Sequence, residues 1–177
     1  ALLVSGCNDN TVRVWRMADG ECLHVMRGHT HHVVCVRMSP DGQKAVSASN
    51  DGTLRVWDVV GGREVSVLRG HTGQLSSVHI THDGRKYISG SIDRTARVWN
   101  AATGRVLKVL QHDDIVYSVC TACGGTIIVT GCLDGTMCLW EMATGARMKT
   151  FAIHADLVYA VCATPDGKRI ASCSADG

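Results

Sequence analysis

The sequence predicts an all-β propeller of four-stranded antiparallel blades, because three observations agree. First, tryptophans recur at steps of 42, 42 and 41 residues, at Trp15, Trp57, Trp99 and Trp140. A repeat of about 40–45 residues is typical of propeller blades. Second, short apolar or β-branched segments alternate with turn signals inside each repeat. Third, no stretch of helical length carries an apolar stripe. The 177 residues predict about four blades' worth of an incomplete ring.

The second repeat indicates how the sequence specifies one blade. Its apolar and β-branched segments predict four strands, at residues 33–38, 44–49, 53–57 and 64–68. Turn-forming residues separate these segments. The sequence Asn50-Asp51-Gly52 is a tight-turn signal between the second and third strands. Ser39-Pro40-Asp41-Gly42 and Gly61-Gly62 mark the other two turns.

The phase of the repeats predicts where the blades begin and end. Residues 1–6 match residues 44–48 in phase, so the chain is expected to start within a blade. We expect an incomplete first blade, three complete repeats and an incomplete last blade, at residues 1–27, 28–69, 70–110, 111–152 and 153–177. The chain is therefore expected to be part of a larger propeller whose remaining blades complete the ring.

Polar residues keep step with the tryptophans. In each repeat a histidine lies 22 positions before an aspartate, a hydroxyl residue lies four before it, and a tryptophan lies six after it. Three sets are complete: His29, Ser47, Asp51 and Trp57; His71, Ser89, Asp93 and Trp99; and His112, Thr130, Asp134 and Trp140.

With Gly28-His29, Gly70-His71, Asp51-Gly52-Thr53 and Trp57-Asp58, these motifs make the chain resemble WD40-repeat proteins over essentially its whole length. The resemblance implies that each His, Ser/Thr, Asp and Trp set forms a hydrogen-bonded relay inside its blade. The chemistry fits, because an indole only donates, a hydroxyl and an imidazole do both, and a carboxylate accepts. Two departures are that the glycine is missing before His112, where the connection is one residue shorter, and that Ile153 replaces it before His154. The loops entering the last two blades are therefore expected to differ in shape.

Serine, histidine and aspartate could also form a catalytic triad. A triad is normally a single site, whereas this set occurs three times in phase and with a tryptophan in each copy. No Gly-x-Ser-x-Gly nucleophile elbow occurs in the sequence. We therefore expect no catalytic residues and no enzyme activity.

The resemblance implies that one rim of the propeller binds peptides or partner domains. The corresponding positions lie three and five residues after each histidine and one before each aspartate. In the earlier repeats they are mostly polar or small: His32, Val34, Asn50, Gln74 and Ser76. The later positions are apolar: Ile92, Ile115, Tyr117, Leu133, Leu157 and Tyr159. Exposed apolar patches mark interaction sites and tyrosine is enriched where binding energy concentrates. The alternative is that strand alternation buries these side chains between blades.

Composition argues against several other functions. The net charge is +2, basic residues are spread out and aromatics are only 5%, so no nucleic-acid groove is expected. No apolar run is long enough for a membrane helix, and no Gly-rich phosphate loop indicates a cofactor. Cys120-x-x-Cys123 lacks a second pair at zinc spacing, so no metal site is expected. The odd count of nine cysteines, mostly in apolar strands, favours an intracellular setting, cytoplasmic or nuclear.

The function expected is a non-enzymatic protein-interaction scaffold whose rim binds a peptide or a partner domain. Two alternatives stay open. The chain could be the sensor or autoinhibitory propeller of a multidomain signalling NTPase, or the substrate receptor of a ubiquitin ligase. A P-loop upstream would favour the first, and an F-box-like segment would favour the second.

Overall fold

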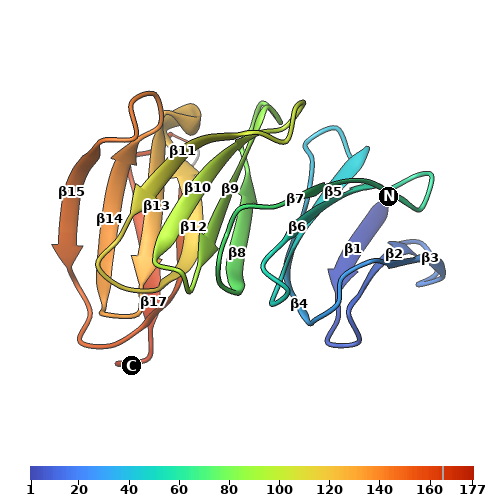
Figure 1. The fold of residues 1–177 in the computed structure, drawn as a ribbon, viewed down its shortest axis with the longest axis horizontal. Coiled ribbons are helices and arrows are strands. Elements are labelled where there is room, and N and C mark those ends of the chain that lie inside the picture. The colour runs from blue at the N-terminus through green and yellow to red at the C-terminus, as the bar shows by residue number, and fades with distance from the viewer. Residues whose placement is uncertain (165) are drawn as a thin grey trace.

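The computed structural model describes residues 1–164 and 166–177, which form five antiparallel sheets (Figure 1). Blade 1 holds β1 (Leu2–Gly6), β2 (Thr11–Arg16) and β3 (Cys22–Arg27). Blade 2 holds β4 (Val33–Met38), β5 (Lys44–Ser49), β6 (Leu54–Asp58) and β7 (Arg63–Leu68). Blade 3 holds β8 (Leu75–Ile80), β9 (Lys86–Ser91), β10 (Thr95–Asn100) and β11 (Val106–Gln111). Blade 4 holds β12 (Val116–Ala122), β13 (Ile127–Cys132), β14 (Thr136–Glu141) and β15 (Arg147–Ala152). Blade 5 holds β16 (Val158–Ala163) and β17 (Ile170–Ser174).

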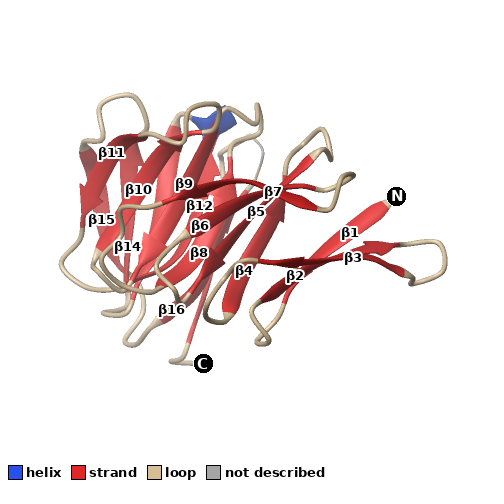
Figure 2. Ribbon diagram, turned by 45° about the vertical axis from the view of Figure 1, so that its right-hand side comes forward, coloured by secondary structure: helices blue, strands red, loops and turns tan. Residues whose placement is uncertain are grey.

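Within every blade, each strand pairs with the next strand along the chain, so the sheets are simple antiparallel meanders. A single turn of 3₁₀ helix, η1 (Cys123–Gly125), is the one helical element in the described part of the chain. Figure 2 shows this element as the short blue segment among strands. The predicted all-β fold of four-stranded antiparallel blades is confirmed.

The apolar core lies between neighbouring blades rather than inside any one of them. Trp57 is 1% exposed and packs with Val12 and Val14 of blade 1. Trp99, equally buried, packs with Val46 and Leu54 of blade 2. Trp57 and Trp99 therefore each fill the gap toward the preceding blade. One tryptophan is needed per blade, so tryptophans recur once in each repeat of about 42 residues.

Glycines in the second strand of a blade let the next blade approach closely. A Cβ on Gly90 would lie 2.9 Å from Val116 Cγ1, and a Cβ on Gly131 would lie 2.6 Å from Val158 Cγ1. Both valines begin the first strand of the following blade, which we call its innermost strand. A larger residue at either glycine would push two blades apart, because interior packing leaves no spare volume.

This stacking leaves two ends to the set of blades. We define the rim as the end formed by the turns between second and third strands together with the connections between blades. It lies along the lower edge of Figure 1, near the C-terminus. The opposite rim carries the turns between first and second strands and η1. None of the helical structure in the described part of the chain is long and apolar enough to cross a membrane.

Candidate functional site

The polar residues of blade 3 form one connected relay. His71 donates from Nδ1 to Asp93 Oδ2 at 2.8 Å, and its Nε2 lies 2.7 Å from Ser89 Oγ. Trp99 donates its indole N–H to the same Ser89 oxygen at 2.9 Å. In blade 2 the corresponding distances are 2.7, 2.7 and 2.8 Å, among His29, Asp51, Ser47 and Trp57. All members find partners, as a buried polar cluster requires.

The charge state of this relay follows from its surroundings. Burial opposes ionisation of Asp93, but hydrogen bonds from Thr95 and His71 outweigh it and lower the pKa of Asp93 to about 2. Burial lowers the pKa of His71, although Asp93 acts in the opposite direction. At neutral pH the relay therefore holds a neutral imidazole and an ionised carboxylate.

Serine, histidine and aspartate are in hydrogen-bond contact, as they are in a triad, but their setting prevents catalysis. Ser47, Ser89 and Thr130 are fully buried, at 0% exposure. In each case an indole N–H also occupies the hydroxyl oxygen. A nucleophile must reach its substrate, so these three hydroxyls serve the fold instead.

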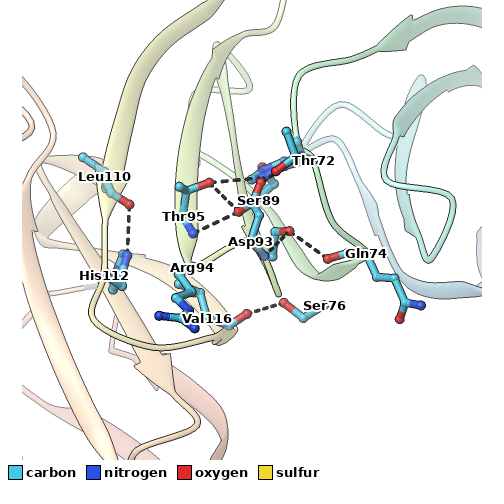
Figure 3. Close-up of polar contacts among 12 residues, drawn as sticks. Thr72, Gln74, Ser76, Ser89, Asp93, Arg94, Thr95, Leu110, His112 and Val116 are labelled. Carbon is cyan, nitrogen blue, oxygen red and sulfur yellow. Dashed lines mark hydrogen bonds and ion pairs between the residues drawn. The ribbon is translucent and has the colours of Figure 1, made fainter.

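Blade 4 departs from the predicted set at one member. His112 donates from Nδ1 to the carbonyl of Leu110 at 3.0 Å (Figure 3). Its Nε2 lies 2.9 Å from Thr130 Oγ1. Asp134 instead accepts from the backbone and hydroxyl of Thr136 at 3.0 and 2.6 Å, and it is exposed. The prediction that Asp134 completes the relay with His112, Thr130 and Trp140 is wrong.

The shortened connection explains this departure. His112 directly follows β11, and its N–H continues the strand ladder by donating to the Arg94 carbonyl at 2.9 Å. The imidazole therefore stays near its own strand, where the Leu110 carbonyl is within reach. Its ring centroid lies 4.7 Å from that of Trp140, against 6.0 Å between His71 and Trp99.

Blade 5 also carries a relay, although it was not among the three complete sets predicted from the sequence. His154 contacts Ser172 Oγ at 2.9 Å and Asp176 Oδ2 at 3.1 Å. The signal is present in the sequence, because the spacings of 18 and 22 residues match those of the other blades. The corresponding tryptophan position, six residues after Asp176, lies beyond residue 177 of the sequence.

A β-bulge places one residue of each innermost strand on the rim. The register between first and second strands shifts at the same point in blades 2 to 5. The residues skipped by these shifts are Val34, Ser76, Tyr117 and Tyr159. Bulges re-aim side chains, and here the two tyrosines are turned outward, 36% and 55% exposed.

The remaining predicted rim residues are paired by a backbone hydrogen bond that repeats from blade to blade. Leu133 N–H donates to the Ile115 carbonyl at 2.9 Å, and Ile92 N–H donates to the Gln74 carbonyl at 3.0 Å. Ile92 and Leu133 are exposed, at 41% and 37%, and Ile115 is half-buried. Leu157 is only 8% exposed. It packs inward and does not offer a contact surface of its own.

The two tyrosines bring blades 4 and 5 together at the rim. Tyr117 and Tyr159 meet edge to face, with ring centroids 6.4 Å apart and planes at 86°. Leu133 follows the end of β13 in the same blade as Tyr117. We call Tyr117, Leu133, Tyr159 and the half-buried Ile115 the tyrosine patch. Ile92 lies in blade 3, in the turn after β9, where the rim is more polar, so it is not part of the tyrosine patch.

The rim between blades 2 and 3 differs in chemistry. A cavity of about 290 Å³ opens there, lined mainly by polar residues and glycines, including Asn50, Thr72 and Gln74. Larger cavities of about 520 and 560 Å³ lie at the opposite rim. The walls of the first include the turn residues Asp41 and Asp83 with Lys44 and Arg85, so charges of both signs alternate there.

The cysteines form no disulfide in the described part of the chain. All nine cysteines are free. Cys120 is buried, and burial raises the pKa of its thiol to about 12. Within residues 1–164 and 166–177, no three His, Cys, Asp or Glu side chains gather so as to hold a metal ion.

Sequence comparison places these repeats among known proteins. The family described as "WD domain, G-beta repeat" matches residues 1–16, 20–58, 62–100, 104–141 and 145–177. A match such as 20–58 runs from β3 of one blade through β6 of the next. The sequence repeat therefore straddles two blades.

Three curated proteins are similar to parts of the chain. The WD repeat-containing protein pop1 of Schizosaccharomyces pombe is 30% identical over 171 residues, covering 92% of this chain and 22% of that protein. Ribosome assembly protein 4 of Saccharomyces cerevisiae is 42% identical over 41 residues, 23% of this chain and 8% of that protein. A component of chromatin assembly factor 1 from Mus musculus is 31% identical over 65 residues, 37% of this chain and 11% of that protein. The chain spans less than a quarter of the length of each.

Proposed function

The chain belongs to the WD40-repeat family, and from this premise we propose that it is a non-enzymatic scaffold that binds a peptide or partner domain at the tyrosine patch. One observation carries the proposal. Tyr117 and Tyr159, from adjacent blades, meet edge to face and are exposed at the same rim as the exposed Leu133.

The relay of blade 5 supports this proposal on the Tyr159 side of the tyrosine patch. His154, in the connection that precedes Tyr159, binds Asp176 in the turn that follows β17, so this connection is tied to its own sheet. A preorganised surface loses less entropy on binding. Blade 4, which carries Tyr117 and Leu133, lacks this link because His112 binds the Leu110 carbonyl instead.

The relatives also support a scaffold. Two of them are named for the assembly of ribosomes and of chromatin. An exposed Tyr117–Tyr159 pair fits such a role, because aromatic anchors dominate protein interfaces.

Affinity capture from the native cell followed by mass spectrometry tests this function. The full-length protein is compared with a variant carrying Tyr117→Ala, Leu133→Ala and Tyr159→Ala. The matched control carries Val65→Ala, Val109→Ala and Met148→Ala, three exposed apolar residues that lie on the last strands of blades 2, 3 and 4. We expect specific partners to be retained by the control and lost from the rim variant, when all three proteins melt alike. An identical set of captured proteins from all three would overturn the proposal.

A further inference from the structure

We propose that the partner segment at the tyrosine patch is cationic, with Lys or Arg side chains beside apolar residues in an extended peptide. This inference rests on the proposed function and specifies its ligand. It is carried by three carboxylates on the same rim, Asp114, Asp134 and Asp156. Each one is the chain neighbour of an apolar rim residue, Ile115, Leu133 or Leu157.

Two of these carboxylates, Asp114 and Asp156, occupy one repeated position, two residues after the histidine. Asp114 Oδ1 accepts from the Ile115 N–H at 2.8 Å, and Asp156 Oδ1 accepts from the Leu157 N–H at 2.7 Å. Blade 2 has His31 at this position and blade 3 has Gly73. The negative charge is therefore particular to the blades that carry the tyrosines.

The third carboxylate is available because of the broken relay. His112 turns to the Leu110 carbonyl, so Asp134 is left exposed with only Thr136 as its partner in the described part of the chain. In blade 3 the equivalent Asp93 is buried against His71. The same change that breaks the blade 4 relay therefore adds a charge to the rim.

Among the described residues, none of Asp114, Asp134 and Asp156 takes part in an ion pair. Arg147, in the same blade as Asp114 and Asp134, is already engaged: it binds Asp113 at 2.9 Å and the Gln111 carbonyl at 2.7 Å. The whole chain carries a net charge of +2, so this excess of negative charge is local.

The patch and its carboxylates together define the occupant. Aromatic rings attract cations as well as apolar groups, and both tyrosines of the patch are exposed. Complementary charge at an interface suppresses wrong partners and sets register. An acidic or phosphorylated segment would meet three uncompensated carboxylates, whereas a basic segment would pair with them.

Selection from a library of random short peptides displayed on phage tests the inference, with the full-length protein as bait. We expect the selected peptides to combine apolar residues with Lys or Arg. The charge variant carries Asp114→Asn, Asp134→Asn and Asp156→Asn, because asparagine keeps the acceptor oxygen that each turn uses. It should still select apolar peptides but lose the enrichment in basic residues.

Two further variants separate the possible outcomes. Asp41→Asn, Asp83→Asn and Asp166→Asn remove the same charge from turns at the opposite rim, and this control should select the wild-type peptides. Tyr117→Ala with Tyr159→Ala should abolish selection. A peptide from the wild-type selection should bind the charge variant about tenfold more weakly at low salt, with affinity measured by fluorescence anisotropy.

The outcomes distinguish this inference from the function on which it rests. Tyrosine-dependent selection of neutral or acidic peptides would overturn the cationic partner and leave the binding rim in place. Selection that ignores the tyrosines, or no selection, would overturn both.

Discussion

Blades 3 and 4 are adjacent copies of one design, and the connection before the histidine is one residue shorter in blade 4. Both join a tryptophan, a hydroxyl and a histidine through a buried oxygen, Ser89 in one and Thr130 in the other. Only blade 3 extends the chain to its turn carboxylate, through His71 and Asp93. The comparison teaches that the relay has two separable halves. The inner half holds the sheet together, and the outer half decides whether a carboxylate is internal or belongs to the rim.

The largest expected difference is in the cost of removing each carboxylate. Asp93 accepts from His71, from the Thr72 backbone and from both donors of Thr95. Asp93→Ala leaves these donors unsatisfied and should lower the free energy of unfolding by about 3 kcal/mol. Asp134→Ala removes only the contacts to Thr136 and should cost less than about 1 kcal/mol.

Urea unfolding of both variants at neutral pH measures this difference. Asp93→Asn is the control for charge, since the amide oxygen can still accept and should recover part of the loss. Equal costs for the two alanine variants would show that Asp134 is as much a part of its relay as Asp93.

The pH dependence of stability should also separate the two blades. Burial lowers the pKa of His112 to about 4, from an ordinary value of 6.5. Between these values the unfolded chain binds a proton that the folded chain does not. Stability is therefore complete above about pH 6.5 and falls as the pH drops toward 4, by roughly 2–3 kcal/mol from His112.

Unfolding free energies measured from pH 7 to pH 4 for His112→Gln and His71→Gln test this assignment. The slope with pH should flatten more for His112→Gln, because Asp93 raises the pKa of His71 back toward its ordinary value. A steeper slope in His112→Gln than in the wild type would contradict the buried neutral imidazole.

The smallest expected effect comes from repairing blade 4. Inserting a glycine between Gln111 and His112 restores the connection length of blades 2 and 3. The longer loop costs little entropy, and a new bond from His112 to Asp134 should stabilise the protein by about 1 kcal/mol. In this background Asp134→Ala should become as costly as Asp93→Ala. An insertion that leaves the cost of Asp134→Ala unchanged would show that connection length is not the cause of the broken relay.

Spacing in the sequence predicted the relays of blades 2 and 3 because their geometry depends on a repeated register. It could not predict blade 4. His112 and Asp134 keep the spacing of 22 residues, yet one residue less before His112 changes which acceptor faces the imidazole. The shorter connection was visible in the sequence, but the acceptor that His112 takes depends on donor–acceptor distances that the spacing of 22 residues does not encode.

The rim shows the same limit. Tyr117, Leu133 and Tyr159 were predicted as contact residues and are exposed, whereas Leu157, predicted by the same rule, is buried. The role of Asp114 and Asp156 was not anticipated, although their shared position two residues after the histidine was visible. Their importance depends on having no cation nearby, which is a property of three-dimensional neighbours.

By itself the sequence determined the all-β fold, the number of repeats and the residues at each repeated position. It could do so because one tryptophan and one set of polar partners must recur wherever a blade packs against the preceding blade. Only the tertiary structure decided which rim side chains face solvent. A bulge in β12 and another in β16 interrupt strand alternation, and the packing of neighbouring blades buries Leu157 while leaving Tyr159 exposed.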